Sequence, residues 1–212
     1  MRDQLLSELL RPTQIADMLL PTNTIKTLEQ IAETSWSPNL LFYGPPGCGK
    51  TSASRIIGGK GLLDHMEVAG SSLKNAASIS EEIEGFVVSL SFSGARKVCV
   101  IDEADSMSKA ADLVLRPLIE KAHENCRFIF TANEIDGLTE PLLSRLLPIY
   151  FRPLGTEKDE AFARWAPRYL KKLRDVGIEI NGDELRKLLD DSKWDLRALA
   201  NRLEFYRIAK AI

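Results

Sequence analysis

Lys50 and Thr51 close the run Gly44-Pro-Pro-Gly-Cys-Gly-Lys50-Thr51, whose spacing is that of a phosphate-binding loop. In such a loop the backbone amides cradle phosphate oxygens, the lysine reaches the β- and γ-phosphates and the threonine hydroxyl ligates Mg²⁺. An apolar run, residues 39–43, precedes the loop and a helical pattern, residues 51–57, follows it. That helix adds the positive end of its dipole to the anion site. The sequence therefore predicts a nucleotide-binding protein.

A second acidic element follows another predicted strand. Residues 97–101 form a short β-rich run, which ends in Asp102-Glu103-Ala-Asp105. We expect Asp102 to hold Mg²⁺ together with Thr51, and Glu103 to polarise a water molecule for attack on the γ-phosphate. The two elements together predict hydrolysis as well as binding.

The pattern of apolar residues predicts the elements that would position these side chains. Over residues 1–152 apolar runs alternate with helical patterns, which indicates an α/β fold with a parallel sheet flanked by helices. The expected strands are 40–43, 66–69, 98–101, 127–131 and 148–151. From residue 153 to 212 the pattern is purely helical, with helices expected at 157–176, 183–191 and 195–212. We expect a nucleotide-binding core followed by a three-helix lid.

The composition is typical of a soluble globular protein, with 212 residues, 44% hydrophobic, 27% charged and a net charge of −2. No apolar segment approaches the roughly 20 residues that cross a bilayer, and the first residues carry acids where a secretory signal is apolar. We expect no membrane association and a cytoplasmic location, which would be the host cytoplasm if the source is viral. A nuclear location also stays open. Cys48, Cys99 and Cys126 are not paired in spacing, so neither a disulfide framework nor a zinc site is indicated.

The order of these motifs resembles AAA+ ATPases of the clamp-loader branch, in particular replication factor C small subunits and the phage clamp-loader ATPase subunit. The resemblance runs from about Leu10 to about Phe205. It implies a P-loop AAA+ core with a five-stranded parallel sheet, a small helical lid, and ATP and Mg²⁺ as cofactors. The motifs that carry it are the P-loop, Asp102-Glu103-Ala-Asp105, Thr131-Ala132-Asn133, Ser144-Arg145 and Asp195-Leu-Arg197.

The resemblance also implies roles for single residues. Asn133 would be sensor 1, which bridges the attacking water and the γ-phosphate, and Arg197 would be sensor 2, the lid arginine that touches the γ-phosphate. Arg145 would be a finger that reaches the nucleotide of a neighbouring subunit, so hydrolysis would depend on that neighbour. The residues that would contact the nucleotide are Arg11, Pro12, Gly44, Pro45, Pro46, Gly47, Cys48, Gly49, Lys50, Thr51, Ser52, Asp102, Asn133 and Arg197.

The partners implied by the resemblance are other clamp-loader subunits in a homo- or hetero-oligomer, a sliding clamp and primer-template DNA. Gly94 to Lys97 would face DNA and Ser106 to Leu115 the clamp. The helix expected between Ser71 and Phe92 offers Lys74 and then Glu81-Glu82-Ile83-Glu84, an unfavourable face for phosphates. The sequence stops at Ile212, before the family's helical collar domain. We therefore expect a two-domain fragment or short form, or assembly that depends on another protein.

We expect a clamp-loader-like motor subunit that uses Mg-ATP binding and hydrolysis to load a sliding clamp onto primer-template DNA in DNA replication. Two alternatives stay open. One is another AAA+ DNA remodeller such as a helicase loader, which clamp stimulation of hydrolysis would distinguish. The other is a non-hydrolysing, nucleotide-gated scaffold subunit. Such a subunit would show no ATP turnover, so Glu103→Gln would not change it.

Overall fold

The core of the molecule is a five-stranded sheet in which every pairing is parallel. This computed structural model describes residues 5–34, 38–59, 64–74, 76–79, 83–91 and 97–210. The strands are β1 (Leu40–Tyr43), β2 (His65–Ala69), β3 (Lys97–Asp102), β4 (Cys126–Ala132) and β5 (Leu147–Tyr150), in the spatial order β2-β3-β4-β1-β5. Because parallel strands share a direction, their carboxyl ends lie along one edge of the sheet, where the P-loop and the acidic turn meet.

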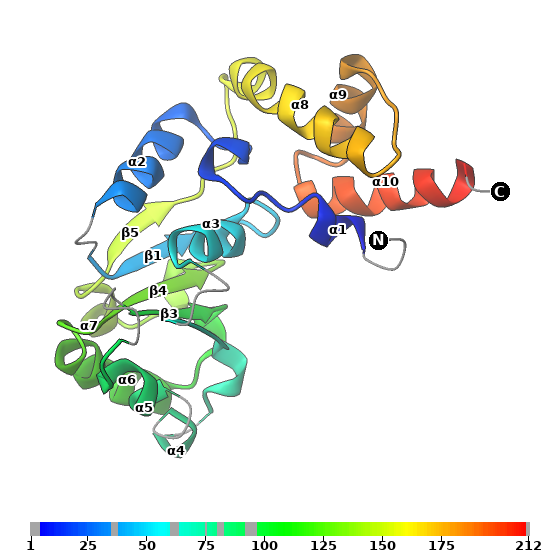
Figure 1. Cartoon of the computed structure of the whole chain (residues 1–212). Coiled ribbons are helices and arrows are strands. Elements are labelled where there is room, and N and C mark those ends of the chain that lie inside the picture. Colours follow the sequence, from blue (N-terminus) through cyan, green and yellow to red (C-terminus); the bar gives the residue numbers. More distant parts are fainter. Residues whose placement is uncertain are drawn as a thin grey trace.

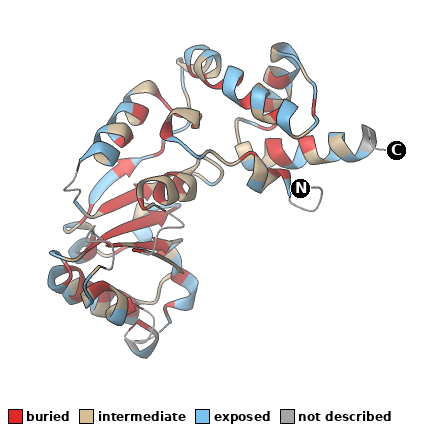
Figure 2. Cartoon of the chain, in the orientation of Figure 1, coloured by how far each residue is buried: buried red, intermediate tan, exposed pale blue. Residues whose placement is uncertain are grey.

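Successive strand residues point to opposite faces of the sheet, and each face is covered by its own helices (Figure 1). Leu41, Ile101 and Phe130 pack in the cluster that contains α6 (Lys109–Lys121). Their neighbours, such as Phe42 and Val100, pack against α2 (Thr22–Glu33) and α3 (Lys50–Ile57). The cluster on the α6 side also includes residues of α4 (Ala76–Ile79), α5 (Gly85–Val88) and α7 (Glu140–Leu143). Figure 2 shows the strands buried between these layers.

A second apolar cluster holds the three C-terminal helices together. They are α8 (Lys158–Asp175), α9 (Gly182–Asp191) and α10 (Leu196–Lys210). Trp165, Leu185 and Leu203 lie at its centre and are almost fully buried. A capping box between Asn181 and Glu184 starts α9.

The N-terminal helix α1 (Leu6–Leu9) packs on this helical cluster, although its sequence lies at the other end of the chain. The Leu6 amide donates to Glu204 Oε2 of α10 at 2.8 Å, and Leu6 is buried in the cluster. Figure 1 shows α1 beside α10. The division of the chain into residues 1–152 and 153–212 stays a prediction, and α1 bridges it.

The expected fold class is confirmed, and each expected strand lies within one or two residues of an observed one. Within the single helix expected between Ser71 and Phe92, the structure describes the helical segments α4 and α5, and Glu81 and Glu82 lie outside the described residues. Short 3₁₀ turns join other elements, at Ile15–Asp17, Gly70–Ser72, Ala104–Ser106 and Ile135–Gly137. None of the helices in the described part of the chain is long and apolar enough to cross a membrane.

Candidate nucleotide-binding site

The loop between β1 and α3 has a backbone that only glycines adopt without strain. Gly44, Gly47 and Gly49 have φ angles of 142°, 76° and 96°, and Gly49 is the residue before the first turn of α3. A Cβ at Gly44 would lie 2.5 Å from the Phe151 carbonyl oxygen, so the loop also packs closely on the end of β5. The glycines therefore shape a loop that wraps over the N-terminus of α3.

The Lys50 ammonium is held inside this loop. Lys50 is 8% exposed, and its Nζ donates to the carbonyl oxygens of Gly44 at 2.7 Å and Pro45 at 2.9 Å. A third bond, at 3.1 Å, goes to Oδ1 of Asn133 at the end of β4. The lysine and the predicted sensor 1 residue, 83 positions apart, are therefore neighbours in space.

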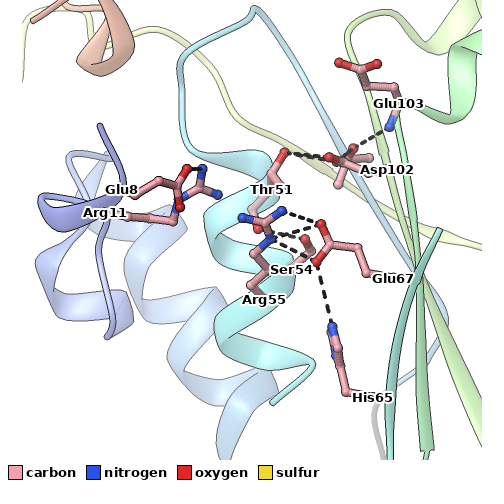
Figure 3. Close-up of polar contacts among 10 residues, drawn as sticks. Glu8, Arg11, Thr51, Ser54, Arg55, His65, Glu67, Asp102 and Glu103 are labelled. Atoms are coloured by element: carbon pink, nitrogen blue, oxygen red, sulfur yellow. Dashed lines mark hydrogen bonds and ion pairs between the residues drawn. The ribbon is translucent and has the colours of Figure 1, made fainter. Parts of the chain in front are cut away.

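Thr51 and Asp102 face each other across the gap between α3 and β3. The Thr51 hydroxyl lies 3.0 Å from Asp102 Oδ1 and 3.3 Å from Oδ2, and Figure 3 shows the two side chains pointing toward one another. A hydroxyl and a carboxylate are oxygen ligands of the kind that Mg²⁺ prefers. Within the described residues no three His, Cys, Asp or Glu side chains form a metal cluster. Mg²⁺ is often held by one or two protein ligands together with phosphate oxygens, and Thr51 and Asp102 offer two such ligands.

Glu103 follows Asp102 in a left-handed backbone conformation, with φ 54° and ψ 50°. Its side chain is exposed and lines the cavity above the P-loop. Figure 3 shows its carboxylate turned away from Asp102 while its backbone nitrogen faces the strand end. The two adjacent carboxylates therefore lie in different places: that of Asp102 is beside Thr51, and that of Glu103 is in the open cavity.

These side chains surround one cavity of about 430 Å³, a volume in the range of small-molecule sites. The predicted site residues that line it are Arg11, Pro12, Pro46, Gly47, Cys48, Gly49, Lys50, Thr51, Ser52, Glu103, Asn133 and Arg197. Gly44 and Pro45 contribute through the carbonyl groups that hold Lys50. Asp102 does not line the cavity itself but is hydrogen-bonded to Thr51, which does. Arg145 does not line this cavity.

The far end of the cavity is built from the N-terminal segment and α8. Arg11 pairs with Glu8 at 2.5 Å, and Asp17 pairs with Lys172 at 3.1 Å. Trp165 and Tyr169 stack with ring centroids 4.2 Å apart. Burial raises the pKa of the Tyr169 hydroxyl, which stays protonated at neutral pH. This half offers ion-paired side chains beside a buried aromatic pair, whereas the P-loop half offers amides and an ammonium.

The start of α10 closes the cavity from the lid side. Asp195 Oδ1 accepts from the amides of Arg197 at 2.8 Å and Ala198 at 3.0 Å, so Asp195 is the N-cap of this helix. Arg197 is exposed and lines the cavity. Within the part of the chain that the structure describes, its guanidinium makes no hydrogen bond or ion pair, so its charge is available to a phosphate.

A polar cluster lies one helical turn beyond Thr51 (Figure 3). Arg55 donates to both carboxylate oxygens of Glu67 on β2, with its Nε 3.0 Å from each. These bonds raise the pKa of Arg55 above its ordinary value.

Within the P-loop, burial raises the pKa of the Cys48 thiol above its ordinary 9.0, although Lys50 opposes the shift. Cys48 is therefore a neutral thiol at physiological pH.

Arg145 lies on the surface just after α7 and is paired with α6. Its Nη2 and Nε lie 2.5 and 2.9 Å from Glu120 Oε1, and its guanidinium also donates to the Pro141 carbonyl at 2.5 Å. One third of the Arg145 side chain is exposed. The arginine is therefore held in a defined direction outside its own cavity.

The surfaces expected to face DNA and the clamp are only partly described. Gly94 to Arg96 lies outside the described residues. Lys97 is 3% exposed and donates to the Phe86 carbonyl at 2.9 Å, so the prediction that it faces DNA is wrong for this conformation. Leu115 is buried in the α6 cluster and is not a surface residue, whereas Leu113 is 63% exposed.

Sequence reasoning missed two features of the site. Thr131 is buried and bonds to both Asp102 and Glu103, and although it belongs to the motif Thr131-Ala132-Asn133, no role was expected for it. The close approach of Asp195 to Gly47 left no sequence signal at all. Both involve contacts between segments that are distant in the chain.

Comparisons with known proteins agree with this geometry. Residues 40–154 match the family model described as the ATPase family associated with various cellular activities (AAA). The chain is 32% identical to replication factor C small subunit 2 of Pyrobaculum aerophilum, over 87% of this chain and 58% of the relative. It is 31% identical to human replication factor C subunit 4, over 88% of this chain and 54% of the relative.

The chain thus spans less than two thirds of the length of these curated relatives. Among solved structures, it is similar to the Thermotoga maritima RuvB Holliday junction branch migration motor, with a TM-score of 0.60 and 21% identity. That match covers 93% of this chain and 73% of the other, and at this identity it supports the fold alone.

Proposed function

The chain belongs to the AAA family of ATPases, and we propose that it is a clamp-loader-like motor subunit that binds and hydrolyses Mg-ATP. Its work would be to load a sliding clamp onto primer-template DNA in DNA replication, together with other clamp-loader subunits. The replication factor C relatives support this branch of the family. The reaction is ATP plus water to ADP plus phosphate.

The observation that carries the ATPase proposal is the convergence of four segments on one cavity. Lys50 comes from the P-loop, Glu103 from the end of β3, Asn133 from the end of β4 and Arg197 from the lid. Lys50 and Arg197 bring positive charge for the γ-phosphate, and Glu103 and Asn133 bring a carboxylate and an amide that can activate and orient the attacking water. A site for a structural nucleotide would have no need of a carboxylate in the position of Glu103.

In the proposed mechanism Lys50 exchanges carbonyl partners for phosphate oxygens. Its Nζ bonds to Gly44 and Pro45 are replaced by bonds to the β- and γ-phosphates, while Asn133 stays within reach to orient the attacking water. Thr51 and Asp102 would hold Mg²⁺, which when bound neutralises phosphate charge. Glu103 accepts the proton of the attacking water at its carboxylate.

Arg145 is proposed to complete the site of a neighbouring subunit. It does not line the cavity of its own chain, and the Glu120 ion pair presents it outward. An arginine suits this role because its charge is permanent and its planar fork matches phosphoryl oxygens. Hydrolysis by an isolated chain should therefore be slow, and the partner subunit should accelerate it.

The experiment that tests the proposal is the steady-state rate of ATP hydrolysis as a function of protein concentration. It is measured alone, with primer-template DNA, and with DNA plus a sliding clamp, and Lys50→Ala provides the blank. The proposal expects a rate per subunit that rises with concentration and again with DNA and clamp. Glu103→Gln should keep ATP binding and lose turnover.

Other outcomes point to the alternative functions. Stimulation by DNA without any effect of the clamp would favour a different AAA+ DNA remodeller, such as a helicase loader. ATP binding with no turnover above the Lys50→Ala blank, under every condition, would favour a nucleotide-gated scaffold subunit and contradict the mechanism.

A further inference from the structure

Thr131 is a polar residue at the centre of the sheet. It lies in β4 between Phe130 and Ala132, is 1% exposed, and pairs in register with Phe42 of β1. A buried hydroxyl without partners destabilises a protein, so such a residue persists where its bonds are satisfied. The question is which groups it serves.

Both hydrogen-bonding functions of this hydroxyl are used on the acidic turn. The Thr131 hydroxyl donates to Asp102 Oδ1 at 2.5 Å and accepts from the Glu103 amide at 3.0 Å. The direction of each bond is defined, because an ionised carboxylate can only accept and an amide can only donate. One side chain therefore contacts both residues to which we assign the metal and water chemistry.

The bond to Glu103 acts on an unusual backbone. A residue with a side chain rarely adopts a φ of 54°, and such a conformation persists only when its surroundings hold it. The Thr131 bond holds the Glu103 amide from one side. From the other side Gly70 packs so closely that a Cβ there would overlap the Glu103 carbonyl oxygen. This backbone turn is what directs the Glu103 carboxylate into the cavity.

The bond to Asp102 acts on the rotation of its carboxylate. Oδ1 accepts from Thr131 at 2.5 Å and from Thr51 at 3.0 Å, whereas among the described residues Oδ2 accepts only the longer Thr51 contact of 3.3 Å. Oδ1 is thus the anchored oxygen. Oδ2 is the less engaged one and is the oxygen left to hold a metal-bound water.

We propose that Thr131 is a positioning residue for ATP hydrolysis, whose single hydroxyl aligns the Asp102 carboxylate and the left-handed turn at Glu103 with each other. The inference rests on the proposed function, because it assumes that these two carboxylates act on Mg-ATP. Loss of the hydroxyl lowers turnover through misalignment, since a displacement of about 1 Å can cost on the order of 100-fold in rate. Nucleotide affinity, which comes mainly from the P-loop, changes little.

The test compares Thr131→Val, which keeps the shape and removes the hydroxyl, with Thr131→Ser, which keeps the hydroxyl. For each we measure kcat, KM for Mg-ATP, the Mg²⁺ concentration for half-maximal rate, and the Tm. We expect Thr131→Val to lower kcat about 10- to 100-fold and to raise the Mg²⁺ requirement, with affinity for a fluorescent ATP analogue within about threefold. Thr131→Ser should stay within about threefold of wild type in kcat.

Thr139→Val is the matched control. The Thr139 hydroxyl also bonds to an aspartate, Asp112, with contacts of 2.9 and 3.0 Å, but Thr139 does not line the nucleotide cavity. The Thr139→Val variant should lower Tm without changing the Mg²⁺ concentration that gives the half-maximal rate. In the Glu103→Gln background, Thr131→Val should leave the affinity for the fluorescent ATP analogue within about threefold, because the P-loop contacts are unchanged.

The outcomes separate the two proposals. If wild type hydrolyses Mg-ATP and folded Thr131→Val matches it in kcat and Mg²⁺ requirement, the positioning role is wrong and the proposed function stands. If Thr131→Val unfolds, Thr131→Ser decides: a folded serine variant with wild-type kcat supports the role, and one with a large loss of kcat overturns it. A wild-type chain without Mg-ATP hydrolysis, even with DNA and clamp, overturns both.

Discussion

The side chain of Asp195 lies against the backbone of Gly47, so that a Cβ added at residue 47 would overlap its carboxylate. Asp195 is also the N-cap of α10, and Arg197 follows it by two residues. Helix α10 therefore begins directly against the phosphate loop.

Gly47→Ala should weaken nucleotide binding. The variant adds a methyl group where the Asp195 carboxylate already lies, at a φ of 76° that disfavours any side chain. Strain of this kind costs about 1–3 kcal/mol, and if the loop relieves it by leaving its phosphate-binding geometry, every 1.4 kcal/mol needed to restore that geometry is about tenfold in affinity. We expect the Kd of a fluorescent ATP analogue to rise about tenfold or more.

Gly182→Ala is the control for this effect. A Cβ at Gly182, in the first turn of α9, meets nothing within 4 Å, and its φ is not in the left-handed region. This variant should bind the analogue as wild type does. Equal affinities for Gly47→Ala and Gly182→Ala would show that the contact with Asp195 is not a constraint.

Asn133→Ala should separate catalysis from binding. The side-chain oxygen Oδ1 of Asn133 accepts a hydrogen bond from Lys50 Nζ at 3.1 Å. Without this bond, Lys50 still donates to the backbone carbonyls of Gly44 and Pro45. We expect kcat to fall about 10- to 100-fold, because the attacking water loses its orientation, with Kd for ATP within about threefold. Steady-state kinetics with titration of the analogue check this, and Asn23→Ala on the exposed face of α2 is the control. A rise in Kd equal to the fall in kcat/KM would mean that Asn133 only binds.

Arg145→Ala should abolish hydrolysis without affecting the stability of the chain. The ion pair with Glu120 is largely exposed, and such pairs contribute only about 0.2–1 kcal/mol. A finger in trans contributes on the order of 1,000-fold to the rate. We expect a loss of that order at concentrations where the wild-type rate per subunit has levelled off, with an unchanged Tm.

Mixing two inactive variants tests whether Arg145 acts in trans. Arg145→Ala keeps its own Glu103, and Glu103→Gln keeps its own Arg145, so a mixed interface contains one complete site. The rate should recover when the variants are combined at equal concentrations. A mixture no more active than its components, at every ratio, would indicate that Arg145 does not complete a neighbour's site.

Stability should fall in alkali because two thiols are buried in the sheet. Burial raises the pKa of Cys126 from 9.0 to about 12 and also raises the pKa of Cys99. The folded state holds these protons more tightly than the unfolded chain does. The stabilisation is therefore complete below pH 9 and is lost as pH rises from 9 toward 12, by at most about 1.4 kcal/mol per pH unit for each thiol.

Urea unfolding of wild type and Cys126→Ala at intervals from pH 7 to 10.5 checks this prediction. The variant should be less stable throughout, but its stability should decline less steeply above pH 9. The two profiles should run parallel below pH 8.5, which is the internal control. Parallel profiles above pH 9 as well would contradict a buried, protonated Cys126 thiol.

Much of this architecture followed from local features of the sequence. Apolar runs predicted all five strands, and the three central ones, β1, β3 and β4, are apolar almost throughout because they are buried on both faces. The spacing of glycines, Lys50 and Thr51 predicted the P-loop, because a few adjacent residues determine that backbone. The expected contact of Thr51 with Asp102 also followed, because a strand that precedes an acidic turn ends at the same edge of the sheet.

Other relationships depended on the tertiary structure. The Leu6 amide donates a hydrogen bond to Glu204, 198 positions away, and Arg145 forms an ion pair with Glu120. Thr131 forms hydrogen bonds with the acidic turn from a neighbouring strand. None of these contacts leaves a repeating signal in the sequence, because each depends on how two separate elements pack. Local periodicity and turn chemistry determined the elements and the phosphate loop. Only their packing decided which side chains hold the catalytic groups in place, because a hydrogen bond acts over about 3 Å and most of these segments are tens of residues apart in the chain.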